Sequence, residues 1–197
     1  LLPYIYTQAV RATETGLPMV RPLLLDYQED PNTKGLDLQY LFGEDFLVAP
    51  ILTRDPSRKV YLPAGDWVDY WTKEKLPASG WISVEAPLDI IPLYVRAGAM
   101  IPYGPEMDYV GQGPLEPLSL ELYQPAEQGK LEIFDEDQPS IGVESQFQDG
   151  VLSLTMTNPP ASIQVTCFGT KVSRMIVNHK EIKITEAAPG FTGTYSA

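Results

Sequence analysis

Hydrophobic residues near the start of the chain recur with a helical period, which predicts a helix over residues 1–15. The positions that carry this period are Leu2, Ile5, Tyr6, Ala9 and Thr13. Pro3 suits the first turn of a helix. Gly16 then ends the helix, because glycine adopts the left-handed conformation without a steric cost.

A nearly continuous apolar run follows at residues 19–25, which is typical of a central parallel strand covered on both faces. Residues 26–35 form a polar loop. Leu38, Leu41 and Phe42 then lie at i, i+3 and i+4, which predicts a short helix over residues 37–42 that ends at Gly43. The start of the chain is therefore predicted to be helix, strand, helix, which cannot close a core alone.

From Phe46 onward the pattern is that of strands only. Residues 46–49 are all apolar, which predicts a strand buried on both faces, and Pro50 places it at an edge or ends it there. Strand signals recur about every 8–12 residues, as in a β-sandwich. They lie at residues 46–49, 58–62, 67–71, 81–84, 92–96 and 99–101.

A second group of strands follows residues 102–117, a segment rich in proline and glycine that we interpret as a connector between domains. Apolar and polar residues then alternate at 118–123, 130–134, 151–156, 162–168 and 173–177. The predicted fold is therefore mainly β. It has a helix-strand-helix segment at 1–45, a proximal β-sandwich at 46–107 and a distal β-sandwich or jelly roll at 108–197.

The composition of the chain disfavours some classes of binding partner. The 197 residues carry a formal net charge of −12, which repels nucleic acids and anionic membranes but leaves neutral sugars unaffected. No apolar run reaches the roughly 18 residues of a membrane-spanning helix. Cys167, the only cysteine, lies on a predicted strand, so we expect a buried hydrophobic side chain, with a reactive thiol as the alternative. The compartment stays open, with the cytoplasm slightly favoured.

Four ordered motifs resemble glycoside hydrolase family 31, which contains α-glucosidases and α-xylosidases. They are the segments 16–23 (GLPMVRPL), 37–52 (DLQYLFGEDFLVAPIL), 60–71 (VYLPAGDWVDYW) and 91–102 (IPLYVRAGAMIP). The resemblance is strong over roughly the first 110 residues and concerns the C-terminal third of the family. The segment 104–109 (GPEMDY) resembles the bacterial α-xylosidase and α-glucosidase branch.

The resemblance implies that residues 1–45 are the end of a (β/α)8 barrel and that two β-sandwiches follow it. The parent enzyme would be a retaining α-glycosidase acting on α-linked glucose or xylose, and this chain would close and brace its barrel. The chain begins without Met, without a signal peptide and inside a predicted helix, so we expect an upstream part of the same polypeptide to be its main partner.

We expect no catalytic residue within the chain. Such an enzyme needs two carboxylates about 5–9 Å apart, and the family's nucleophile lies in a Trp-x-Asp-x-Asn-Glu motif. Asp69 follows Trp67 in a similar pattern, but no Asn-Glu comes after it, so we assign Asp69 a structural role. His179, the only histidine, lies in a predicted hairpin turn. We also expect no substrate-binding residue, cofactor or metal ligand.

Three further sites of charged residues are weaker candidates for a functional role. Asp26 follows the presumed last barrel strand, so a supporting role at the active-site face stays open beside that of a loop-start residue that hydrogen-bonds the next turn. Arg21, within a buried strand, predicts a structural ion pair across the barrel. The adjacent acids Asp135, Glu136 and Asp137 lack the alternating ligands and turn glycine of a calcium loop, which favours a polar turn.

Aromatic residues at Trp67, Tyr70, Trp71 and Trp81 suggest either a core or a platform for sugar rings. Trp67 and Trp71 share one face of a regular strand, so we predict that both point into the core. Two other functions remain as hypotheses: a stand-alone, non-catalytic carbohydrate-binding β module, and an assembly module that forms homo-oligomers. Which sugar the parent prefers does not follow from the sequence.

Overall fold

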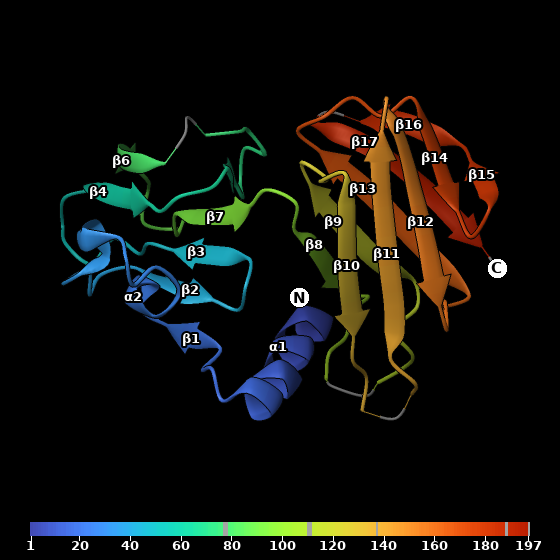
Figure 1. Cartoon of the computed structure of the whole chain (residues 1–197), viewed down its shortest axis with the longest axis horizontal. Coiled ribbons are helices and arrows are strands. Elements are labelled where there is room, and N and C mark those ends of the chain that lie inside the picture. The colour runs from blue at the N-terminus through green and yellow to red at the C-terminus, as the bar shows by residue number, and fades with distance from the viewer. Residues whose placement is uncertain (77–78, 110–111, 137, 188, 197) are drawn as a thin grey trace. The chain divides into compact units, whose positions relative to one another are not determined.

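The computed structural model describes residues 1–76, 79–109, 112–136, 138–187 and 189–196. The chain divides into two compact units, each with its own core (Figure 1). Unit 1 consists of Leu1–Val10 and Gly98–Ala197, and unit 2 consists of Arg11–Ala97. Unit 1 is therefore built from two separate stretches of the chain, between which unit 2 is inserted.

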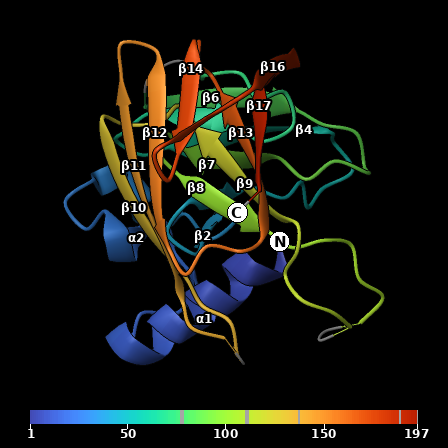
Figure 2. The same cartoon turned by 90° about the vertical axis from the view of Figure 1, so that its right-hand side faces the viewer.

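Unit 1 contains a β-sandwich of two five-stranded sheets (Figures 1 and 2). The first sheet has the order β10 (Gln128–Ile133), β11 (Ile141–Gln148), β12 (Val151–Thr157), β14 (Arg174–Val177) and β15 (Lys180–Ile182). The second has the order β16 (Ile184–Ala187), β17 (Gly190–Ser196), β13 (Ser162–Phe168), β9 (Leu118–Tyr123) and β8 (Met100–Tyr103).

Alternation along the strands explains this sandwich. Every second residue of β9, β12 and β13 is buried, and these residues meet in one apolar cluster that includes Leu120, Leu154 and Val165. The predicted strands of the distal domain are thus confirmed. Two pairings, β9 with β13 and β12 with β14, are parallel, whereas the others are antiparallel.

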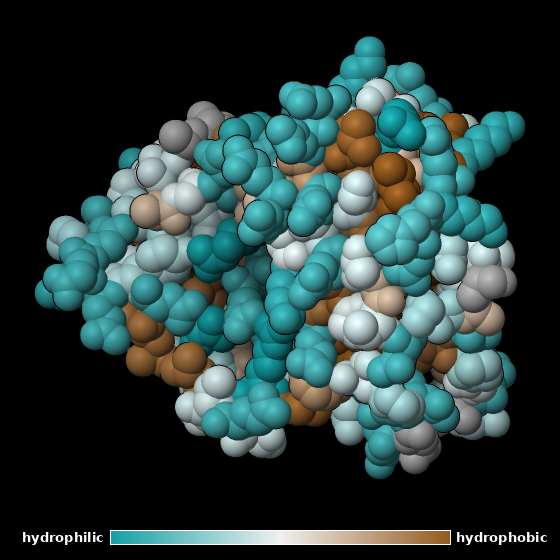
Figure 3. Space-filling model, turned by 45° about the vertical axis from the view of Figure 1, so that its right-hand side comes forward, coloured by the Kyte–Doolittle hydropathy of each residue, from teal (hydrophilic) through white to brown (hydrophobic). Residues whose placement is uncertain are grey.

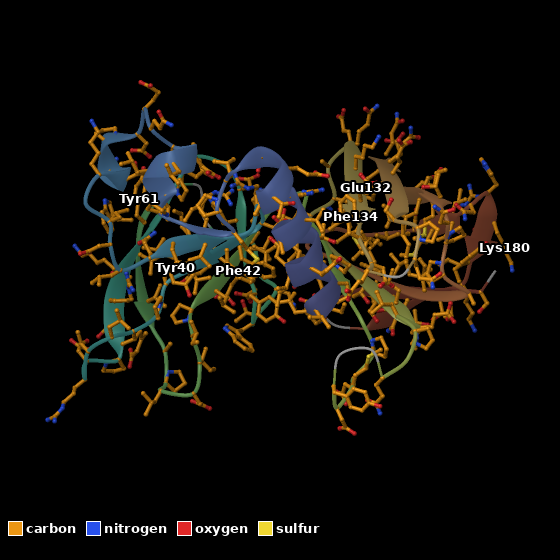
Figure 4. The ribbon with its side chains drawn as sticks, turned by 90° about the horizontal axis from the view of Figure 1, so that it is seen from below. Tyr40, Phe42, Tyr61, Glu132, Phe134 and Lys180 are labelled. Atoms are coloured by element: carbon orange, nitrogen blue, oxygen red, sulfur yellow. The ribbon has the colours of Figure 1, made fainter. Side chains whose placement is uncertain are left out.

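Helix α1 (Leu2–Thr15) confirms the predicted first helix and ends at Gly16, whose φ is 74°. Its buried residues are Pro3, Tyr4, Thr7 and Gln8. The Oγ1 of Thr7 accepts a hydrogen bond from the backbone N–H of Phe134 (labelled in Figure 4), at 3.1 Å. The buried residues are thus not those that carry the helical period, of which Leu2 and Tyr6 remain exposed.

Unit 2 has a sheet of short strands and a two-stranded ribbon. The sheet has the order β1 (Val20–Arg21), β2 (Tyr40–Phe42), β3 (Phe46–Val48), β7 (Leu93–Arg96) and β5 (Trp67–Asp69). The ribbon pairs β4 (Ser57–Leu62) with β6 (Gly80–Glu85). Helix α2 (Leu23–Asp26) and the 3₁₀ turn η1 (Pro31–Thr33) connect β1 to β2.

Two predictions for this region were wrong. Residues 37–42 do not form a helix: Tyr40–Phe42 is the strand β2, paired antiparallel to both β1 and β3, with Leu41 fully buried. Residues 19–25 do not form one parallel strand, because Pro22 has no N–H to continue the ladder and instead precedes the first turn of α2. Gly43, at a φ of 64°, lies in the hairpin turn between β2 and β3.

The observed units also differ from the predicted division at residues 45 and 107. Strands β1 and β2 belong to the same sheet as β3, so residues 1–45 are not a separate layer. Strand β8 includes Pro102 and Tyr103 and pairs with β9 in unit 1, so residues 104–117 connect neighbouring strands of one sheet and are not a connector between domains. Strand β3 lies within its sheet and not at an edge, and it ends before Pro50.

Candidate functional site

Asp69, whose sequence pattern is most similar to the family's nucleophile motif, stabilises a turn. The side chain of Asp69 accepts hydrogen bonds from the backbone N–H groups of Trp71, at 2.8 Å, and Thr72, at 2.9 Å. These bonds close the turn that follows β5. Within the described part of the chain, no group of three or more His, Cys, Asp or Glu residues is placed to hold a metal ion.

Arg21 and Asp26 form an ion pair in unit 2. The guanidinium donates from Nε to Oδ1 at 2.7 Å and from Nη2 to Oδ2 at 2.8 Å. Arg21 is buried, so this bidentate contact compensates its charge. The predicted structural ion pair is confirmed, but the partner lies five residues away and not across a barrel. Asp26 thereby holds the end of α2 to β1.

The remaining candidate residues lie in connections between strands or in the core. His179 is exposed in the two-residue turn between β14 and β15, as predicted. Asp135 and Glu136 lie between β10 and β11, and Asp137 is outside the described residues. Cys167 is fully buried in the sandwich core, and burial raises the pKa of its thiol to about 12. The expected hydrophobic role of Cys167 is confirmed.

The aromatic residues do not form a single platform. Trp67 is 1% exposed, and its indole N–H donates to the carbonyl of Pro63 at 3.0 Å. Trp71 is 49% exposed, because β5 ends at Asp69 and the turn redirects the chain. Its indole N–H donates to the carbonyl of Ile91 at 2.7 Å. The prediction of a core position is therefore right for Trp67 and wrong for Trp71.

Two further aromatic residues form a pair on the β4–β6 ribbon. The rings of Tyr61 and Trp81 are 5.2 Å apart between centroids, and Trp81 is half exposed. The hydroxyl of Tyr61 (labelled in Figure 4) donates to Oδ2 of Asp30. This hydrogen bond lowers the pKa of Asp30, while burial and the same bond raise the pKa of Tyr61. The pair anchors the loop around η1 to the ribbon.

A polar groove in unit 1 was not identified from the sequence. It has a volume of about 920 Å³ and lies at the ends of β10, β11 and β12 that meet the turn after β11. Its lining residues are Glu127, Gln128, Gln146, Phe147, Gln148, Asp149, Val151 and Ser153. The signal that could have revealed it is the spacing of Gln146 and Gln148, which places both amides on one face of a strand.

Large apolar side chains are exposed mainly near the start of the chain. Of the fourteen that are exposed within the described residues, eight come from residues 1–38. Unit 1 contributes Leu1, Leu2 and Tyr6, and unit 2 contributes Leu17, Val20, Leu24, Leu25 and Leu38. In contrast, hydrophilic residues cover most of the face drawn in Figure 3. Within unit 2, Leu24 and Leu25 are adjacent in α2, and contiguous exposed apolar side chains are typical of an interaction surface.

Residues 16–101 match the model of the glycosyl hydrolase family 31 C-terminal domain. The chain belongs to this family. An α-xylosidase of Saccharolobus solfataricus is 32% identical to this family 31 chain over 186 residues, which are 93% of the chain and 25% of the relative. An isomaltosyltransferase of Sporosarcina globispora is 42% identical over 110 residues, or 55% of the chain and 10% of the relative.

A solved structure agrees with this assignment. The cycloalternan-forming enzyme from Listeria monocytogenes, determined with a pentasaccharide substrate, superposes with a TM-score of 0.89 at 25% identity. The match covers 100% of this chain and 21% of that protein. The family 31 chain thus spans between a tenth and a quarter of the curated relatives named above. Among its described residues, no helix is long and apolar enough to cross a membrane.

Proposed function

We propose that this chain is the C-terminal accessory region of a longer retaining α-glycosidase, an α-glucosidase or α-xylosidase, and that it braces the catalytic barrel without hydrolysing glycosides itself. The observation that carries this proposal is the concentration of exposed apolar side chains in residues 1–38. Fully burying an exposed leucine side chain contributes about 1.5–3 kcal/mol, and these side chains, which are 37–53% exposed, gain a proportionate part of it when they are covered. The exposed apolar residues of each unit therefore gain free energy when another part of the polypeptide covers them.

The candidate acids support a non-catalytic role. Asp69 closes a turn, and Asp26 is engaged by Arg21 through both carboxylate oxygens. Retaining hydrolysis requires a free nucleophile and an acid about 5–5.5 Å apart. In this proposal both catalytic carboxylates belong to the barrel, which lies in the part of the polypeptide beyond this chain.

The test combines activity with association. The purified chain should not cleave aryl α-glucosides or aryl α-xylosides, and turnover above the blank would contradict the proposal. Co-expression with the polypeptide encoded directly upstream should yield a stable complex that is active. A complex that forms without activity would reject the glycosidase assignment and keep the bracing role.

Matched leucine variants locate the contact. The double substitution Leu24→Asp and Leu25→Asp in α2 places charges on the proposed surface and should weaken the complex at least about a hundredfold. Leu88→Asp is the control, because Leu88 is fully exposed and lies outside residues 1–38. Equal weakening by both variants would show that the exposed residues of 1–38 are not the contact.

The exposed residues of 1–38 would also be covered if the chain paired with itself. Light scattering of the purified chain distinguishes this case. A dimer that Leu24→Asp and Leu25→Asp dissociate, and that the upstream polypeptide does not replace, would favour an assembly module. A monomer, or a dimer that the upstream polypeptide displaces, supports the bracing role.

A further inference from the structure

We propose that the polar groove on the first sheet of unit 1 is a binding site for a neutral saccharide. The groove itself is independent of the proposed function, but the choice of α-linked glucose oligomers as its ligand rests on that function. Its volume of about 920 Å³ lies within the range of about 300–1,000 Å³ that is usual for small-molecule sites. The strands β10, β11 and β12 that form it lie side by side in Figures 1 and 2.

The side chains at the floor of the groove share one face of the sheet. Along β11, Val143 and Ser145 are buried, while Glu144, Gln146 and Gln148 are exposed. Gln146 lies directly opposite Gln128 on β10 and opposite Ser153 on β12. Directly opposed residues have Cβ atoms about 4.5–5.5 Å apart. Two amides and a hydroxyl are therefore lined up across three strands, with Gln148 beside them.

The chemistry of the lining suits sugar hydroxyls. Each glutamine amide offers two donor hydrogens and one acceptor oxygen, and the carboxylates of Glu127 and Asp149 offer acceptors. A pyranose hydroxyl both donates and accepts, so it can use both kinds of group. The lining contains two acids and no Lys, Arg or His, which disfavours phosphorylated or other anionic ligands. Val151 adds an apolar contact for a ring face.

Neighbouring polar residues on the same face are paired, whereas the groove amides are not. Lys130 and Glu144 form an ion pair at 3.5 Å, and Arg174 and Glu181 form another at 2.9 Å. Within the described part of the chain, the amides of Gln128, Gln146 and Gln148 have no protein hydrogen-bond partner. These exposed amides are therefore open to solvent and to a ligand, because no ion pair or side-chain hydrogen bond among the described residues occupies them.

The groove is also firmly held by backbone structure. The N–H of Phe147 donates to the carbonyl of Glu127 at 3.1 Å, and the carbonyl of Gly150 accepts from the N–H of Ser173 at 2.7 Å. Asp149 and Gly150 have φ values of 50° and 77°, as a tight two-residue hairpin turn requires. A site on strands presents its groups with less conformational freedom than a site on a loop.

The experiment is a titration of the isotopically labelled chain with maltotriose, isomaltotriose and, as a control, inorganic phosphate, followed by NMR of the glutamine side-chain NH₂ groups. We expect saturable shifts of the groove amides at millimolar trisaccharide and none with phosphate. The absence of saturable shifts with both trisaccharides would overturn the proposal. This measurement does not involve the barrel, so its failure would leave the bracing role intact.

Matched substitutions assign the site. Gln146→Ala and Gln148→Ala should each weaken trisaccharide binding about tenfold, because each removes hydrogen bonds to the ligand. Thr155→Ala is the control, since Thr155 is exposed on the same face of β12 outside the groove and should leave the affinity unchanged. Full affinity in both glutamine variants, or its loss in Trp81→Ala, would place the sugar elsewhere and overturn the assignment to the groove.

Discussion

The two units of this chain are stabilised by different means. Unit 1 has long paired strands around one large apolar cluster, to which both of its sheets contribute. Unit 2 has strands of two to six residues and a smaller cluster around Trp67, Leu47 and Tyr94. Its loops are tied to the strands by side chains instead. The comparison shows that a β unit with short ladders depends on individual polar side chains.

Gln39 and Arg58 illustrate this dependence. The buried amide of Gln39 donates to the carbonyl of Tyr61 at 2.7 Å and accepts from its N–H at 3.0 Å, in place of a neighbouring strand. Arg58 donates to the carbonyls of Leu38, at 2.8 Å, and Pro50, at 2.6 Å. Such bonds satisfy backbone groups that a longer sheet would pair through its own ladder.

The chain carries a separate reporter for each unit. All three tryptophans, at 67, 71 and 81, lie in unit 2, and the only cysteine, Cys167, lies in the core of unit 1. Tryptophan fluorescence therefore reports on unit 2. The rate at which a thiol reagent labels Cys167 reports on the opening of unit 1, because a buried thiol with a raised pKa does not react in the folded state.

The largest effect is expected from Trp67→Ala. Trp67 is the largest fully buried side chain, and its removal should cost about 3–5 kcal/mol. Fluorescence of the remaining tryptophans should show unfolding at lower urea, while the labelling rate of Cys167 stays unchanged. Leu88→Ala is the control, with an expected change of about 0.5 kcal/mol or less because Leu88 is fully exposed in the same unit. Faster labelling of Cys167 in Trp67→Ala would show that the units are not independent.

The reciprocal substitution is Leu120→Ala in the core of unit 1. Leu120 is fully buried in β9, so a loss of about 2–5 kcal/mol is expected. Labelling of Cys167 should accelerate, whereas the fluorescence transition should stay where it is. Leu88→Ala, at an exposed position, should change neither readout. A shift of the fluorescence midpoint in Leu120→Ala would mean that both units unfold as one.

A smaller effect is expected from Gln39→Ala. The substitution leaves the backbone N–H and carbonyl of Tyr61 without their partner, and one unsatisfied buried group costs about 1–3 kcal/mol. Urea unfolding followed by fluorescence measures the loss. The control is Gln28→Ala, which removes an exposed amide from the same unit and should change stability by about 0.5 kcal/mol or less. Equal stability of the two variants would show that the Gln39 side chain does not stabilise unit 2.

The smallest effect, and a stabilising one, is expected from His179→Gly. Asn178 and His179 both have positive φ, 46° and 65°, in the turn between β14 and β15. Glycine is favoured at the second position of such a turn, and the hairpin after β11 already has it as Gly150. The substitution should stabilise unit 1 by about 0.5–1 kcal/mol and slow the labelling of Cys167. Faster labelling would contradict the assigned turn geometry.

The same contrast explains which elements could be predicted from sequence. Residues 118–123 alternate cleanly, because a core on one face and solvent on the other select for that pattern, and β9 lies there. Strand β11 was not identified, because Ser145 is polar yet points inward. Gly129 opposite leaves the space for it, since a Cβ at Gly129 would lie 2.5 Å from the Ser145 Oγ.

In unit 2 the failures concern short segments. Leu38, Leu41 and Phe42 fit a helical period, but three residues of β2 between two strands satisfy more hydrogen bonds than one isolated turn. The role of a single residue could be predicted better than the role of residues that come together from several strands. The hydrogen bonds of Asp69 agree with the structural role expected for it. The spacing of Gln146 and Gln148 lies along one strand, whereas only strand pairing brings Gln128 and Ser153 beside them.

The origin of unit 1 from residues 1–10 and 98–197 has a consequence for synthesis on the ribosome. Strand β17 (Gly190–Ser196) lies between β16 and β13, so the second sheet cannot be completed until β17 itself emerges. Unit 2 is translated in full before that point and can fold first. Until then β13 presents an unpaired edge. Premature termination shortly before β17 would therefore produce an aggregation-prone nascent chain.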